Sequence, residues 1–261
     1  MSSPAELYAA ILADPDSAEL RLRYADAVAG TDPDHAELIR LGLEKERLGR
    51  QASPLPLEQS DRYRRLIRAI GPRIAADVAP LVDEWRLRRG FVELVEMDAE
   101  SFLTKGDEVY RRAPVRHVIL TDAAGLTEAL AASPLLGRLT SLVFTDSPIG
   151  DEGVEALVRS PHLRKLRYLS LDHTDVGLRG AEALAAADTL PELRYLDFSG
   201  NPIVITPQAD GQDAVSGEIV DIKYPGYGRR LLEKYGHRPW LTYTSPDPER
   251  QKLWQPDFGE V

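Results

Sequence analysis

Apolar residues recur at a fixed interval in the middle of the chain. Leu139, Leu166 and Leu193 are spaced 27 residues apart, and the residues after each of them repeat one order of apolar and polar positions. Each copy reads apolar-x-x-apolar-x-apolar, and one more apolar residue follows a short polar turn. These further positions are Leu142, Leu169 and Leu196, then Phe144, Leu171 and Phe198, then Ile149, Val176 and Ile203.

This pattern is typical of leucine-rich repeats, in which a short strand is followed by a helix that returns the chain. Side chains alternate between the two faces of a strand, so we expect Leu142 to point inward and Val143 to point to the open, concave face. Residues 151–159 and 180–187 carry apolar side chains at helical spacing, which predicts the return helices. One repeat cannot bury its apolar face alone, so stacked copies would share one core.

Two earlier segments fit the same template with shorter spacing, and residues 99–112 between them have a helical pattern. Their apolar positions are Val92, Val95 and Met97 in the first segment and Val115, Val118 and Leu120 in the second. We therefore expect five strands, of which the first two are irregular, as terminal repeats often are.

The pattern of apolar residues in the N-terminal third of the chain predicts helices. Residues 4–50 read as three short helices, separated by breaks at residues 14–15 and 30–33. A fourth helix is expected at about residues 58–69 and a short fifth at about residues 73–82.

Three passages in this region resemble a group of bacterial leucine-rich-repeat proteins that carry an N-terminal repeat-companion domain. The passages are AELYAAILADPDSAELRLRYADAVAG, HAELIRLGLEKERL and WRLRRGFVELVEMDAESF. In that family a helical module precedes the repeats, and an Arg-Gly-Phe-Val-Glu step, here residues 89–93, introduces the first strand. The family usually continues Tyr-Ala-Asp with Trp-Leu and a charged turn, whereas residues 27–30 are Ala-Val-Ala-Gly here. The resemblance implies a fold, but it does not imply any particular catalysed reaction.

Together these observations predict an α/β protein with three parts. Residues 1–88 would form an all-helical companion module that caps the repeats. Residues 89–203 would form a short right-handed leucine-rich-repeat solenoid, with parallel strands on its concave face and helices on its convex face. Residues 204–261 would form a polar loop and a capping segment with an acidic, Pro-rich tail.

Composition narrows the class of function. The 261-residue chain has no cysteine, which excludes a disulfide framework, thiolate zinc sites and a cysteine nucleophile. Its net charge of −10 argues against general nucleic-acid binding. The N-terminus lacks the basic region of a signal peptide, and no apolar run approaches the length of a membrane span, so we expect a cytoplasmic protein.

The sequence contains no phosphate-loop, zinc-protease, nucleophile-elbow or calcium-loop motif. Residues 172–175, Asp-His-Thr-Asp, are the densest candidate for a metal or acid–base cluster, but the repeat register places them in a turn. There we expect Thr174, like Ser147 and Asn201 at the equivalent positions, to bond to backbone. We therefore expect no enzyme activity, no cofactor and no metal.

Binding is expected on the concave face, where equivalent positions of adjacent strands form columns. Tyr and Arg flanked by acids are typical of protein-binding hot spots. The predicted protein-binding residues are Arg116, His117, Arg167, Tyr168, Asp172, Arg194, Tyr195 and Asp197. A second candidate is a docking peptide with Trp254 and Phe258. The alternative, that Arg and Tyr only pair across strands on an exposed sheet, stays open.

We accordingly predict a non-enzymatic scaffold or adaptor that binds another protein. A second interpretation is a regulated component, such as a substrate, inhibitor or subunit of a bacterial protease, that is recognised through the polar loop at residues 208–218. A third is nucleic-acid contact through the basic run that begins at Arg62 and ends at Arg89.

Overall fold

The computed structural model describes residues 2–51, 53–203 and 227–240. These residues fall into two compact units, which are described separately. Among the described residues, unit 1 holds those up to Glu96 together with Lys105–His117, and unit 2 holds Met97–Thr104 and those from Val118 onward.

Unit 1 begins with helices, as the sequence predicts. The helices are α1 (Pro4–Ala13), α2 (Ala18–Val28), α3 (Pro33–Gly49) and α4 (Leu57–Ile74). The first three start where a side-chain oxygen accepts a hydrogen bond from a free backbone N–H. Ser3, Ser17 and Asp32 provide these oxygens. The three predicted N-terminal helices are therefore confirmed.

The predicted break between a fourth and a fifth helix is wrong. One helix, α4, continues through Pro72 to Ile74, and only a 3₁₀ turn, η1 (Ala79–Leu81), follows it. A proline removes one helical hydrogen bond, but α4 buries Tyr63, Leu66 and Gly71. A Cβ atom placed on Gly71 would lie 3.4 Å from the Trp85 ring, so this stretch of helix packs closely and stays helical.

A hairpin that the sequence analysis missed follows the helices. Strand β1 (Glu84–Arg88) pairs antiparallel with β2 (Phe91–Asp98), so the described residues contain six strands rather than the expected five. Arg89 and Gly90 form the turn with φ values of 48° and 82°. Both values are positive, which is typical of a tight two-residue hairpin turn.

Helix α3 fixes this turn in place. A Cβ atom on Gly90 would lie 2.2 Å from Cγ1 of Ile39, so only glycine fits there. His35 Nε2 donates a hydrogen bond to the Gly90 carbonyl oxygen at 2.9 Å. The ring of Phe91 lies among the rings of Tyr8, Tyr24 and His35, with centroid distances of 5.4–5.9 Å. The core of unit 1 thus holds the base of the hairpin against the helices.

Unit 2 contains the repeats. Its strands are β3 (His117–Thr121), whose first residue belongs to unit 1, β4 (Ser141–Phe144), β5 (Tyr168–Ser170) and β6 (Tyr195–Asp197), and they are neighbours in that order. The β4–β5 and β5–β6 pairs are parallel, with Leu142, Leu169 and Leu196 in register. This confirms the register that was predicted from the 27-residue period.

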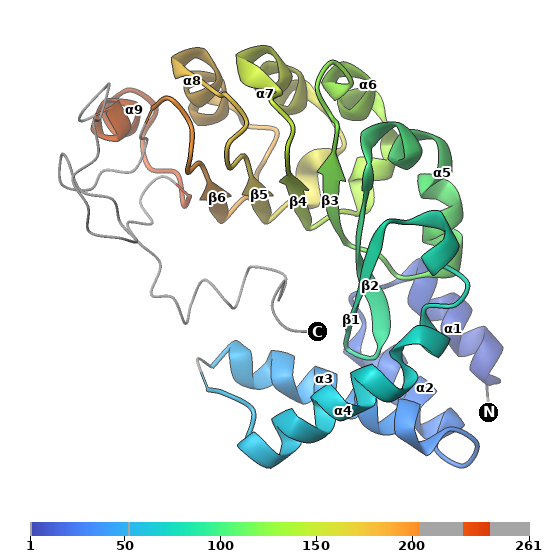
Figure 1. Ribbon diagram of the computed structural model, residues 1–261. Helices are drawn as coiled ribbons and strands as arrows, with labels where there is room; N and C mark the ends of the chain where they lie inside the picture. Colours follow the sequence, from blue (N-terminus) through green and yellow to red (C-terminus); the bar gives the residue numbers. More distant parts are fainter. Residues whose placement is uncertain (1, 52, 204–226, 241–261) are drawn as a thin grey trace. The chain divides into compact units, whose positions relative to one another are not determined.

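Helices lie along one side of these strands (Figure 1). They are α6 (Thr127–Ala132), α7 (Gly150–Arg159), α8 (Leu178–Ala186) and α9 (Tyr227–Tyr235), with the 3₁₀ turns η2 (Pro134–Arg138) and η3 (Leu163–Lys165) between them. Helix α5 (Ala99–Arg112) is divided between the two units. Successive helices from α6 to α9 pack on one another. Helices α5, α7 and α8 confirm the predicted return segments, whereas α6 and the 3₁₀ turns were not predicted.

Candidate functional site

The predicted site residues fall in both units. Arg116 and His117 belong to unit 1, and the other six described residues belong to unit 2. Trp254, Phe258 and the loop at residues 208–218 lie outside the described residues, so these predictions stay predictions.

Polar side chains hold the turns of unit 2. Ser147 Oγ accepts a hydrogen bond from the backbone N–H of Ala123 at 3.1 Å. Thr174 Oγ1 donates to a backbone carbonyl at 2.7 Å, and Asn201 Oδ1 accepts from the N–H of Val176 at 2.9 Å. Ser147 and Thr174 are fully buried. The predicted turn chemistry is therefore confirmed, and each turn is tied to its own or the neighbouring repeat.

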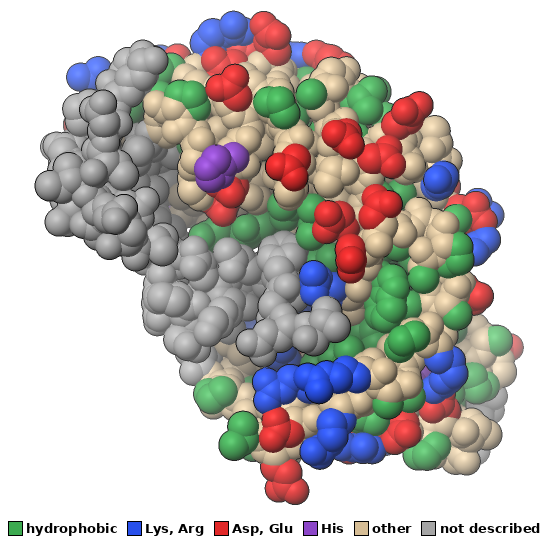
Figure 2. Space-filling view, viewed as in Figure 1, with side chains coloured by type: hydrophobic (Ala, Val, Ile, Leu, Met, Phe, Trp, Pro, Cys, Tyr) green, Lys and Arg blue, Asp and Glu red, His purple; other side chains and the backbone are tan. Residues whose placement is uncertain are grey.

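The acidic segment at residues 172–175 forms part of such a turn. His173 has φ 53°, and Asp146 in the preceding turn has φ 48°. His173 Nδ1 lies 2.7 Å from Oδ1 of Asp172, and both side chains are exposed. Within the described residues, no three His, Asp or Glu side chains are arranged to hold a metal ion. Acidic side chains gather on the face of unit 2 that carries the strand-to-helix turns (Figure 2).

Tyr168 and Tyr195 stack on each other. Their ring centroids are 5.1 Å apart and their planes differ by 11°. The parallel β5–β6 register places the two residues opposite each other, so the flat faces of their rings meet. Only 3 % of Tyr168 and 9 % of Tyr195 is exposed. The expectation of an open aromatic surface is therefore wrong, because the two rings are buried.

The charged members of the predicted set in unit 2 differ in accessibility. Arg167 is exposed. Arg194 donates to the Pro191 carbonyl at 3.0 Å and lies 3.6 Å from a Glu192 carboxylate oxygen. Asp197 accepts a hydrogen bond from the N–H of Ser199 at 3.1 Å. Arg194 and Asp197 thus bond to neighbouring residues of the chain. Arg167 is the more exposed of the two arginines and the more accessible to a partner.

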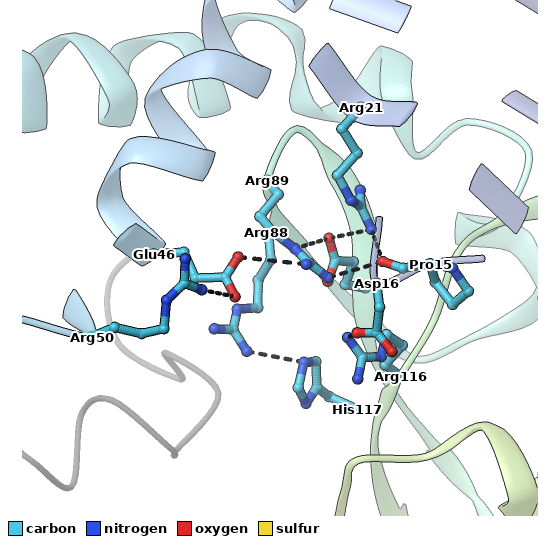
Figure 3. Close-up of polar contacts among 10 residues, drawn as sticks. Pro15, Asp16, Arg21, Glu46, Arg50, Arg88, Arg89, Arg116 and His117 are labelled. Atoms are coloured by element: carbon cyan, nitrogen blue, oxygen red, sulfur yellow. Dashed lines mark hydrogen bonds and ion pairs between the residues drawn. The ribbon is translucent and has the colours of Figure 1, made fainter. Parts of the chain in front are cut away.

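Arg116 and His117 belong to a cluster of charged residues in unit 1, which we call the arginine cluster (Figure 3). Its members are Asp16, Arg21, Glu46, Arg50, Arg88, Arg89, Glu93, Arg116 and His117. Arg116 forms an ion pair with Asp16, and Arg88 Nη1 donates to His117 Nε2 at 2.9 Å. Arg88 ends β1, whereas His117 begins β3, so two strands position this contact.

Glu93 lies at the centre of the arginine cluster. Its Oε1 is 3.0 Å from Arg21 Nη2 and accepts from Arg89 Nε at 3.0 Å, while its Oε2 accepts from Arg89 Nη2 at 2.5 Å. Arg21 and Glu93 are fully buried. Burial lowers the pKa of Arg21 to about 10, although the Glu93 carboxylate opposes this shift. Two buried guanidinium groups thus share one buried carboxylate.

His117 is buried among positive charges. Burial, and then Arg88, Arg116 and Arg89, hold the pKa of His117 well below its ordinary value, so its imidazole is neutral. A guanidinium can only donate, so Nε2 is the acceptor in the contact with Arg88 and Nδ1 carries the proton. This buried Nδ1–H has no hydrogen-bond partner in the described part of the chain.

The sequence analysis missed most of this cluster. Arg88 and Arg89 were assigned to a basic run, Glu93 was placed only in the step that introduces the first strand, and Arg21 was given no role. One available signal was the segment Glu84–Arg88, in which polar and apolar residues alternate before Arg89 and Gly90. A tight turn that contains glycine between two such segments indicates a hairpin. With the hairpin assigned, Arg88 and Glu93 come from adjacent paired strands.

Much of the predicted basic run is neutralised by carboxylates. Arg62 lies 2.6 Å from Glu37, and Arg73 lies 2.8 Å from Asp32. Lys and Arg side chains nevertheless gather over the helices of unit 1 in Figure 2. Since paired guanidinium groups are less available to phosphates, the run offers a nucleic acid fewer contacts than its count of arginines implies.

The comparison with protein families decides the nature of the repeats in unit 2. The family model described as Leucine Rich repeat matches residues 139–158 and 162–185. The two matched segments are leucine-rich repeats. The first matched segment covers β4 and nearly all of α7, and the second covers β5 and nearly all of α8, which are the elements that the 27-residue period predicts.

No curated protein and no solved structure matches the chain. Within the described residues, no helix combines the length and the apolar character that crossing a membrane requires. Leucine-rich repeats offer extended surfaces that bind proteins, so the repeats indicate a protein-binding role.

Proposed function

We propose that this protein is a non-enzymatic scaffold or adaptor whose leucine-rich repeats bind another protein through the strand side of unit 2. The helical part of unit 1 would be its repeat-companion domain, and unit 2 would be a short solenoid in a bacterial, cytoplasmic protein. These assignments agree with the resemblance in the first hundred residues and with the leucine-rich repeats of unit 2.

The observation that carries the proposal is the regular spacing of side chains across β4, β5 and β6. Ser141, Tyr168 and Tyr195 form one in-register column, and exposed Arg167 precedes Tyr168 on β5. The stacked, buried rings hold β5 and β6 together, so exposed Arg167 stands on a rigid support that loses little entropy on binding. Arginine beside tyrosine is a composition that protein interfaces favour.

The burial of Tyr168 and Tyr195 dictates the experiment. Removing either ring would disturb the packing of the strands, so loss of binding by an alanine variant would be ambiguous. A photo-crosslinking amino acid placed at Arg167 avoids this problem, because Arg167 is exposed. Arg159 on α7, which is also exposed, gives the matched control position on the helix side.

We expect that illumination in native cell extract links a partner protein to the chain labelled at Arg167 and not to the chain labelled at Arg159. Mass spectrometry of the product would identify the partner. Equal cross-linking from both positions would place the contact away from the strands. Cross-linking only from Arg159 would contradict the proposal directly.

The other two interpretations gain no specific support from the described residues. The regulated-component interpretation depends on residues 208–218, which lie outside them. Nucleic-acid contact depends on arginines of which several are paired with carboxylates, among them Arg62 and Arg73. Protein binding by the repeats is therefore the function that we adopt.

A further inference from the structure

We propose that residues 241–254 of this chain, which we call the 241–254 segment, dock on the strand side of unit 2, so that a partner protein must displace them. The docking needs only unit 2, whereas the displacement rests on the proposed function. Three features carry the inference: the burial of the strand side, the point at which the described chain ends, and a matching order of charges. The segment itself lies outside the described residues.

The strand side of β5 is almost as buried as the side that faces the helices. Side chains alternate along a strand, so Leu169 faces the helices, whereas Tyr168 and Ser170 face the other way. Tyr168 is 3 % exposed and Ser170 is 4 % exposed, against 1 % for Leu169. Helices α6, α7 and α8 lie on the opposite side of the strands, so they do not account for this burial (Figure 1). A further layer of chain on the strand side would account for it.

Ser141 adds a requirement for hydrogen bonding on the same side. It is in register with Tyr168 on the neighbouring strand β4, and only 1 % of it is exposed. Its hydroxyl group has no hydrogen-bond partner in the part of the chain that the structure describes. A buried hydroxyl group without a partner is costly, so such groups are usually bonded. An extended segment that crosses β4 and β5 offers backbone N–H and carbonyl groups for this purpose.

The last described residues lie close to the start of β6. Arg238 Nε donates to the carbonyl oxygen of Ala185 at 2.9 Å, and Arg238 Nη2 lies 3.7 Å from Asp188, in the connection that leads to β6. Trp240, where this part of the description ends, is buried. Asp247 follows Trp240 by 247 − 240 = 7 residues, which span up to about 23 Å when extended. Since neighbouring strands lie about 4.8 Å apart, the 241–254 segment can reach β5 and β4.

The charges along the strands change from basic to acidic. Arg164, Lys165 and Arg167 come directly before β5, and all three are exposed. Asp146 and Asp172 follow β4 and β5, in the strand-to-helix turns where acidic side chains gather (Figure 2). Arg167 and Asp172 are 172 − 167 = 5 residues apart, which is about 16 Å in a strand. A peptide that follows the strands would therefore meet positive charge first and negative charge second.

The 241–254 segment carries the complementary order of charges. Asp247 and Glu249 come first, and Arg250 and Lys252 follow. Asp247 and Lys252 are 252 − 247 = 5 residues apart, so in an extended chain their separation is also about 16 Å. Pro248 disfavours helix at the residue before it, which favours an extended path. A segment that starts beside β6 and runs toward the turns thus pairs acids with bases at both ends of the strands.

The test is intramolecular cross-linking in the purified full chain. A photo-crosslinking amino acid replaces Arg167, so that Arg164 and Lys165 stay in place before β5. Arg159 on α7 gives the matched position on the helix side. We expect illumination to join position 167 to residues 241–254 in a product with the mass of one chain, and position 159 to give no such product. Digestion and mass spectrometry would map the joined residues.

Charge reversal then tests the matching order of charges. Asp247→Lys with Glu249→Lys should lower the yield of this product by about threefold at low ionic strength, which is the scale of one or two exposed ion pairs. Asp257→Lys with Glu260→Lys is the matched control, because it changes the net charge equally outside the segment. Adding Arg164→Glu and Lys165→Glu to the first variant should restore the yield. Circular dichroism checks that each variant folds.

Three results would overturn the docking. They are the absence of a product in residues 241–254, an equal yield from positions 159 and 167, and a product with the mass of two chains. A control reversal that lowers the yield as much as Asp247→Lys with Glu249→Lys would overturn the charge matching, since the effect would then follow net charge alone.

The same label in native cell extract separates this inference from the proposed function. A partner that cross-links to position 167 more strongly in the Asp247→Lys, Glu249→Lys chain than in wild type would support displacement. An intramolecular product without any partner would support the docking and contradict the proposed function. A partner without the intramolecular product would support the proposed function and overturn the docking.

Discussion

Glu93 is the residue whose replacement tests the arginine cluster most sharply. Its carboxylate makes three contacts of 3.0 Å or less with the guanidinium groups of Arg21 and Arg89. The change Glu93→Gln keeps the size of the side chain and one carbonyl oxygen. It removes the negative charge and introduces an NH₂ group that faces guanidinium donors. At least one contact then places two hydrogen-bond donors opposite each other.

The expected loss follows from burial. Arg21 and Glu93 have no exposed surface and Arg89 is 7 % exposed, so water cannot replace the lost charge. Removing one partner of a buried ion pair destabilises a protein by about 3–5 kcal/mol, because the remaining charge is left uncompensated. Since domains are stable by about 5–15 kcal/mol, Glu93→Gln should remove a large part of the stability of unit 1.

Equilibrium unfolding in urea, followed by circular dichroism, measures this loss. Glu44→Gln is the matched control, because Glu44 forms an exposed ion pair with Arg47 on α3. Exposed pairs contribute little to stability, so the control should unfold almost as wild type does. Intrinsic fluorescence should follow the same transition if the unit unfolds cooperatively.

A second substitution distinguishes the loss of the ion pair from a general disruption of packing. In Glu93→Gln, Arg89 keeps its ion pair with Glu46 whereas Arg21 loses its carboxylate partner. The further change Arg21→Met removes this buried charge, so the double variant should be more stable than Glu93→Gln alone. The reasoning would be refuted by a loss below about 1 kcal/mol in Glu93→Gln, since a buried pair costs more to break. It would also fail if Arg21→Met lowered the stability of Glu93→Gln further.

Three further predictions concern the core, the helix ends and the response to alkali. Leu169→Ala should lower the free energy of unfolding by about 2–5 kcal/mol, because Leu169 is buried in the leucine ladder, and a urea midpoint equal to wild type would contradict this. Asp151 Oδ1 accepts hydrogen bonds from two backbone N–H groups at the start of α8, at 2.7 and 2.9 Å. Asp151→Ala should therefore cost about 1–2 kcal/mol in urea unfolding, whereas the neighbouring Glu152→Ala should not. Burial, and then the nearby Tyr24, raise the pKa of Tyr8 from 10.0 to about 12, so the folded state keeps this proton to higher pH than the unfolded state. The resulting stabilisation is present below pH 10 and is lost as the pH rises toward about 12, and unfolding measured across that range should show a smaller loss in Tyr8→Phe.

The repeats were predictable because their signal is periodic. A strand position such as Leu169 recurs 27 residues before and after, and each copy must bury its side chain against the same kind of helix. Errors in single positions therefore average out over the copies. The turn residues Ser147, Thr174 and Asn201 were predictable for the same reason, since the register alone places them where backbone groups need partners.

The arginine cluster was not predictable because nothing in it repeats. Arg21 and Glu93 are distant in sequence and come together only when the hairpin packs on α2 and α3 within unit 1. A buried arginine has the same local pattern as an exposed one on an amphipathic helix. The stacking of Tyr168 on Tyr195 was missed for a related reason, since the register gives the neighbours of a ring but not the orientation of its plane.

The arginine cluster is also difficult to explain as a stabilising feature. Buried ion pairs often contribute no more than apolar residues of the same volume, and this cluster contains more guanidinium groups than carboxylates. Pairing explains Arg21 and Arg89, which share Glu93, but it does not explain why Arg88 donates to a neutral imidazole. Glu93→Gln therefore tests whether the pairing of Arg21 and Arg89 holds the cluster together.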